Sequence, residues 1–122
     1  MAFYRAKRAS GGGSTGWSFV EAVSMVPSTA TFTIGTSLTV GKIYHIFTTN
    51  SGGSTSTADL VTAITASSGV SDLTLHHNVN GYYGTSPAYS SMFHYSFKAT
   101  AQTAIFAKQA AARRLGYILF AE

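Results

Sequence analysis

Short segments of alternating apolar and polar residues fill most of this chain, and they constrain its fold more than any other feature. Residues 30–34 place Phe32 and Ile34 on one face, and residues 91–99 do the same with Phe93, Tyr95 and Phe97. A period of two is the pattern of a β-strand with one buried face. Glycine, serine and proline separate such segments about every 8–12 residues. The sequence therefore predicts an all-β fold, a single antiparallel β-sandwich or jelly roll of seven or eight strands.

Two segments depart from this pattern. In residues 57–67 a threonine is placed to cap a short helix, so a helix is as compatible with the segment as a strand. The inward face of that helix would hold Leu60, Val61 and Ile64. Residues 107–115 are rich in alanine, glutamine and arginine, a composition that favours a helical turn.

Two predicted strands are apolar on both faces. Residues Ile43 and Phe47 lie opposite Tyr44 and Ile46, and in the last strand Tyr117 and Leu119 lie opposite Ile118 and Phe120. A two-layer sandwich buries only one face of each sheet, so the second face must meet solvent, the arm or a loop, or another subunit. Charged residues make up only 10% of the chain, against about 25% in an average domain. This scarcity favours another subunit, and we expect a homo-oligomer.

The beginning of the chain differs in composition from the rest. We expect residues 1–16 to be a flexible basic arm with a glycine and serine linker, and residues 17–122 to be the β-sandwich domain. Aromatic and cationic groups together suit an arm that docks on a partner. The candidate docking residues are Phe3, Tyr4, Arg5, Lys7 and Arg8.

The remaining charge is spread thinly over the body. The formal net charge is +4, and three of the eight basic residues lie in the arm. Nucleic-acid binding would need the arm to act together with Lys108, Arg113 and Arg114, and it is not expected from so sparse a basic surface.

The sequence has no cysteine, no signal peptide and no apolar run near the ~18 residues of a membrane span. We expect neither a secreted nor a membrane protein.

The four histidines, His45, His76, His77 and His94, are the candidate metal ligands. A zinc site needs three or four ligand atoms within about 2.1 Å of the ion. Because His76 and His77 are adjacent in a predicted strand, they should point to opposite faces and cannot share an ion. His76 with His94 on a neighbouring strand, or one histidine from each of three subunits, is the alternative. Our expectation is no metal and no cofactor.

The sequence contains no recognisable catalytic pattern. Its four carboxylic acids, Glu21, Asp59, Asp72 and Glu122, are scattered, whereas glycoside hydrolysis needs two that face each other. Neither G-x-S-x-G nor G-x-x-x-x-G-K-[ST] occurs. We therefore expect a protein that is not an enzyme.

Residues 80–89, NGYYGTSPAY, are the predicted loop best suited to a ligand. Tyrosine offers a rigid ring with a polar tip, which suits sugars and proteins. A carbohydrate- or receptor-binding module is therefore the alternative function, with Asn80, Tyr82, Tyr83 and Tyr89 as its candidate residues. The same tyrosines would also suit packing over the rim of the sandwich or in a subunit contact.

As a whole, the chain resembles small structural proteins of tailed bacteriophages: capsid decoration proteins, head fibres and tail-associated β-sandwich domains. The resemblance lies in the arm MAFYRAKR, the hinge SGGGSTG, the short strands of TATFTIGTSLTVGKIYHIFTTN and the final LGYILFAE. It implies a trimer of sandwich or jelly-roll domains, anchored through residues 2–9 to another virion protein such as the major capsid protein. It also implies a virion protein made in the host cytoplasm, without catalytic residues.

Overall fold

The computed structural model describes residues 16–27, 29–52, 64–83, 88–108 and 114–122, and within them the chain forms eight strands and no helix. The strands are β1 (Ser18–Val23), β2 (Thr31–Thr33), β3 (Ile43–Gly52), β4 (Ile64–Ser68), β5 (Val70–Tyr83), β6 (Ala88–Ala99), β7 (Ile105–Lys108) and β8 (Arg114–Ala121). The predicted all-β sandwich is confirmed.

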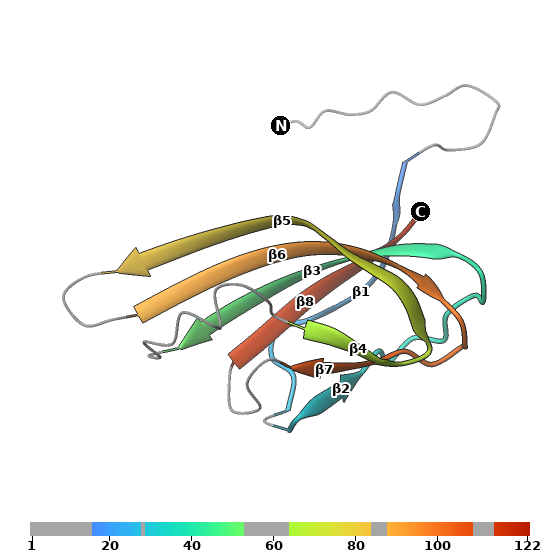
Figure 1. Ribbon diagram of the computed structural model, residues 1–122, viewed down its shortest axis with the longest axis horizontal. Coiled ribbons are helices and arrows are strands. Elements are labelled where there is room, and N and C mark those ends of the chain that lie inside the picture. Colours follow the sequence, from blue (N-terminus) through green and yellow to red (C-terminus); the bar gives the residue numbers. More distant parts are fainter. Residues whose placement is uncertain (1–15, 28, 53–63, 84–87, 109–113) are drawn as a thin grey trace.

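Two antiparallel sheets form the layers of the sandwich. The larger has the order β1-β8-β3-β6-β5 and the smaller β2-β7-β4. In Figure 1 the smaller sheet lies below one part of the larger sheet, and the ends of β5 and β6 extend beyond it. The pairs β1–β8, β2–β7 and β3–β6 are nested, first strand with last, which is the order in which a jelly roll is wound. The order departs from a jelly roll at β5, which pairs with β6 and not with β4.

Aromatic side chains fill the space between the sheets. Phe106 of β7 is fully buried and packs on Phe32 and Phe97, with ring centroids 5.6 and 5.2 Å away. The row predicted from alternation in β6 is confirmed, since Phe93, Tyr95 and Phe97 are all buried. In β3 and β8, where both faces are apolar, the buried face holds Tyr44, Ile46, Tyr117 and Leu119.

Gly69 is the single residue between β4 and β5, where the chain passes from the smaller sheet to the larger. Its φ of +73° lies in the left-handed region. A Cβ at this position would lie 2.0 Å from the carbonyl oxygen of Thr103. Only glycine fits this crossing, so the path of β5 depends on it.

The segment predicted as helix or strand ends in a strand. Ile64 begins β4 and is buried, which agrees with the strand alternative for this part of the segment. Residues Thr57, Leu60 and Val61 lie outside the described residues, as do residues 109–113 of the second ambiguous segment.

A bulge in β1 explains the position of Glu21. The register with β8 shifts between Phe19 and Glu21, so that Phe19 faces outward and Glu21 inward. Regular alternation along residues 17–25 would place Trp17, Phe19, Val23 and Met25 on one face, interrupted by Glu21. This pattern does not hold, because the bulge changes the alternation. Glu21 accepts hydrogen bonds from the Gly35 and Thr36 amides, the Thr36 hydroxyl and the Tyr117 hydroxyl. It therefore ties β1 to the turn after β2 and to β8.

Replacing Glu21 by glutamine should lower the free energy of unfolding by about 1–2 kcal/mol, because charge-assisted hydrogen bonds become neutral ones. Burial raises the pKa of Glu21, but the hydrogen bonds from Thr36, Tyr117 and Gly35 outweigh it and the pKa is lowered. The carboxylate therefore stabilises fully above the unfolded value of 4.5, and this effect is lost as the pH falls through the lower folded pKa. Urea denaturation at neutral pH and at acid pH measures both effects.

Asp72→Asn is the matched control, because Asp72 is exposed and asparagine tolerates its φ of 55°. Equal stability of Glu21→Gln and Asp72→Asn would contradict a structural role for Glu21.

Candidate functional site

The face of the larger sheet turned away from β2, β4 and β7 is the candidate site, and we call it the outer face. Strand register places three rows of side chains across it: Phe19, Phe120, His45, Ser96 and Thr74; Ala22, Ile118, Phe47, His94 and His77; and Gly116, Thr49, Met92 and Val79. This confirms that β3 and β8 are apolar on both faces.

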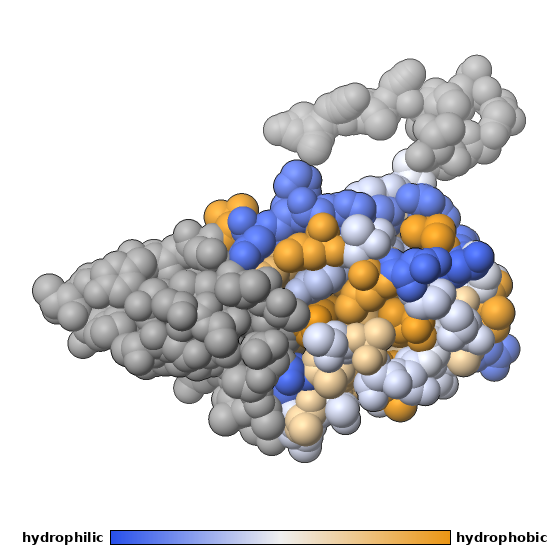
Figure 2. All heavy atoms as spheres, in the orientation of Figure 1, coloured by the Kyte–Doolittle hydropathy of each residue, from blue (hydrophilic) through white to orange (hydrophobic). Residues whose placement is uncertain are grey.

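Large apolar side chains on this face remain accessible. Their exposed fractions are 63% for Phe19, 65% for Val79, 50% for Met92, 44% for Trp17 and 43% for Ile118. At typical side-chain areas these five expose on the order of 500 Å². Contiguous apolar patches beyond a few hundred Å² mark interaction sites on soluble proteins. In the view of Figure 2, strongly hydrophilic residues gather along the upper edge and at the right of the described surface, and pale or apolar residues lie between and below them.

A shallow groove of about 650 Å³ runs across part of this face. Phe47, Met92 and Ile118 line it, and Gly116 contributes to its floor. A Cβ on Gly116 would lie only 2.6 Å from the carbonyl oxygen of Ser24, so the chain after β1 lies directly against β8 here. The groove therefore has apolar walls, and closely packed backbone forms its floor.

All four histidines of the chain gather on the outer face. The register of β5 with β6 shifts between Leu75 and His77, and this bulge turns both His76 and His77 toward His94. The ring centroids of His76 and His77 lie 4.8 and 5.9 Å from that of His94. Our expectation that His76 and His77 point to opposite faces was wrong, because regular alternation fails at the bulge. We call His45, His76, His77 and His94 the histidine cluster.

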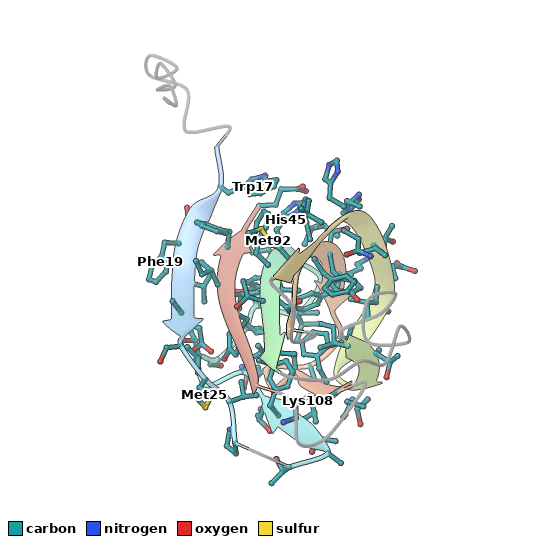
Figure 3. All side chains as sticks on the ribbon, turned by 90° about the vertical axis from the view of Figure 1, so that its left-hand side faces the viewer. Trp17, Phe19, Met25, His45, Met92 and Lys108 are labelled. Atoms are coloured by element: carbon teal, nitrogen blue, oxygen red, sulfur yellow. The ribbon has the colours of Figure 1, made fainter. Side chains whose placement is uncertain are left out.

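A chain of hydrogen bonds crosses the cluster. Nε2 of His45 lies 2.9 Å from Glu122 Oε2, and its Nδ1 lies 2.9 Å from Nε2 of His94. Trp17 stacks on the His45 ring at 3.7 Å and leaves His45 only 6% exposed. On the neighbouring strand His76 Nε2 is 2.7 Å from the Ser96 hydroxyl. Figure 3 places Trp17, His45 and Met92 on one side of the molecule and Lys108 at the opposite end.

His94 is held in its neutral form. Burial lowers its pKa to about 4, with further contributions from the charges of His76, His45 and His77. The folded pKa lies below the usual value of 6.5, so the neutral ring of His94 contributes fully to the stability of the fold above pH 6.5. This contribution is lost as the pH falls toward 4. The stacked ring of Phe47, 4.3 Å away, forms one wall of this environment. Acid therefore acts directly on the centre of the outer face.

Both ring nitrogens of His45 are hydrogen-bonded, one to His94 and one to Glu122, and Nε2 of His76 is hydrogen-bonded to Ser96. Among the described residues, no three histidine or acidic side chains are arranged to hold a metal ion. The same part of the chain contains no helix long and apolar enough to cross a membrane.

The other predicted site residues fall in different places. The arm residues Phe3, Tyr4, Arg5, Lys7 and Arg8 lie outside the described residues. The loop predicted at residues 80–89 was too wide, because the backbone of Asn80, Tyr82 and Tyr83 belongs to β5 and that of Tyr89 to β6. Register pairs Tyr82 with Tyr89 and Asn80 with Ser91. The connection between the two strands is shorter, at residues 84–87.

Lys108 does not contribute to a basic surface. Its side chain is buried and Nζ donates to the Pro27 carbonyl at 2.7 Å. Burial lowers the pKa of this amine. A phosphate-binding surface made from the arm with Lys108, Arg113 and Arg114 therefore lacks one of its members.

The comparisons with protein-family models, curated proteins and solved structures found no match for this chain. Its fold class alone does not select a function, since jelly rolls and sandwiches occur in capsid proteins, lectins and cupins.

Proposed function

We propose that this chain is a non-enzymatic structural subunit of a bacteriophage particle, a decoration or fibre-like protein. Its outer face is buried against further copies of the chain, with a trimer favoured, and residues 2–9 dock on another virion protein such as the major capsid protein. The observation that most supports assembly is the apolar outer face. Its five large exposed side chains supply on the order of 500 Å², more than half of the ~800 Å² that each partner buries in a standard interface.

Charge favours a second copy of the chain over the chain's own arm as the cover of the outer face. Arg5, Lys7 and Arg8 give the arm three cations. Glu122, the carboxylate beside the cluster, is already paired with His45. Any charge that the imidazoles of the cluster gain by protonation is positive. Among the described residues of the cluster the arm therefore meets no unpaired carboxylate, and its cations are suited to a different surface, that of the particle.

Deleting residues 2–9 should leave the body folded and assembled but abolish its attachment to the particle. The arm is expected to supply the docking contacts, whereas the outer face supplies those between subunits. Co-sedimentation of the purified chain with particles that lack it measures attachment. Replacing Arg5, Lys7 and Arg8 by glutamine is the matched control of equal length, and it should weaken attachment most at low salt, where the charges are least screened. Undiminished attachment of the deletion variant would show that the arm is not the anchor.

A carbohydrate- or receptor-binding module is the second candidate. It is favoured by the register that sets Tyr82 across from Tyr89 near the end of the β5–β6 hairpin. Glycan binding that is lost on Tyr82→Ala, by a chain that is a monomer, would support this function over the structural one.

A further inference from the structure

We propose that the histidine cluster makes assembly through the outer face dependent on pH, so that subunits associate at neutral pH and separate in mild acid. This inference rests on the proposed function, because it concerns the same face. It adds the regulation of that contact, and it identifies the chemical event as uptake of protons by imidazoles at the centre of the interface.

The position of the cluster is the first support. His45, His94 and His77 occupy the two rows that also contain Phe19, Phe120, Phe47 and Ile118. Any copy that covers these apolar side chains also covers the imidazoles. Imidazole is the side chain that proteins commonly use to change charge with pH near neutrality. Charges taken into an apolar contact lose their hydration, and equal charges from several copies would repel one another about a symmetry axis.

The hydrogen bond between His45 and His94 is the second support. Its two nitrogens are 2.9 Å apart, so one must donate and the other accept. If both nitrogens carried protons the hydrogen bond would be lost. The contact holds one shared proton, and the other ring nitrogen of His45 lies against Glu122. A further proton taken up by the cluster would add positive charge beside this hydrogen bond, and no described carboxylate is hydrogen-bonded to His76, His77 or His94.

The charged groups around the cluster do not offset this change. His45 projects from β3, His76 and His77 from β5 and His94 from β6, and Glu122 follows β8. The side chain that reaches the cluster from the start of β1 is Trp17, which has no charge. Lys98, one row beyond Ser96 on β6, adds positive charge to the same face. Acidification therefore turns a nearly neutral apolar surface into a cationic one.

Sedimentation velocity of the full-length chain between about pH 7.5 and 5.5 tests the proposal. The apparent dissociation constant should rise at least about tenfold at the lower pH, equal to about 1.4 kcal/mol of association free energy. Far-UV circular dichroism at each pH defines the range in which the chain is folded, and the comparison is made within it. The triple variant His76→Gln/His77→Gln/His94→Gln keeps hydrogen-bonding groups but cannot titrate. It should associate at pH 7.5 and keep its affinity at pH 5.5.

Lys98→Gln is the matched control, since it removes a positive charge from the same face and leaves every imidazole in place; it should keep the pH dependence. An oligomer whose affinity is the same at both pH values, or a triple variant that still dissociates in acid, would overturn the regulatory inference and leave the proposed function standing. A monomer at both pH values would instead contradict the proposed assembly itself.

Discussion

A chain with lysine in place of both Met92 and Ile118 should be a folded monomer. Both side chains project from the outer face into the groove and are about half exposed, so lysine at either position can extend into solvent when the subunit is alone. In the assembled state each lysine would be buried without a partner, which typically costs about 2–5 kcal/mol. We expect the dissociation constant to rise by about 100-fold or more, measured by sedimentation velocity at neutral pH.

The control variant adds the same charge elsewhere. Met25 and Val40 are 57% and 58% exposed, but they lie in connections outside the strands of the outer face. Met25→Lys/Val40→Lys should therefore assemble like the unchanged chain. Equal dissociation of the two double variants would mean that the added charge controls association, whether or not it lies on the outer face.

Phe106→Ala should lower the free energy of unfolding by about 3–5 kcal/mol, because it leaves a cavity where the two sheets meet. Phe106 is 0% exposed and packs between Phe32 of the smaller sheet and Phe97 of the larger. Such a loss is a large fraction of the stability of a small domain. Urea denaturation should be measured in the monomeric Met92→Lys/Ile118→Lys chain, so that association does not contribute to the free energy.

Phe19→Ala makes the same chemical change on the outer face. In the monomeric background it should change the free energy of unfolding by much less than Phe106→Ala, because Phe19 is 63% exposed. In the otherwise unchanged chain it should weaken association. A Phe19→Ala effect on folding as large as that of Phe106→Ala would show that Phe19 belongs to the core and not to an interface.

The sequence predicted the fold class and the buried rows where alternation is regular. Phe93, Tyr95 and Phe97 are all buried, as are Phe32 and Ile34. It failed where strands contain bulges, because a bulge changes which face the following residues occupy. Regular alternation would put Leu75 and Val79 on the same face, but the register pairs Leu75 with the buried Tyr95 and Val79 with the exposed Met92. A bulge depends on pairing with a distant strand, and no local pattern reveals that pairing.

The candidate site was predicted only in part. The sequence indicated that β3 and β8 have two apolar faces, and so that one face needs a cover. It did not reveal that His45, His76, His77 and His94 meet, because their meeting requires the β3–β6 pairing as well as the bulge in β5. The one available signal was that every histidine falls in a predicted strand. Trp17 was expected at the start of the body, but its stacking on His45 depends on tertiary structure.

Light scattering over a range of concentrations at neutral pH measures the molar mass of the unchanged chain in solution. It tests assembly directly, without any substitution. One chain weighs 12.8 kDa. Burial of the outer face between copies predicts a mass that is a small multiple of this value, three chains being the expected number. A mass of 12.8 kDa at every concentration would contradict it.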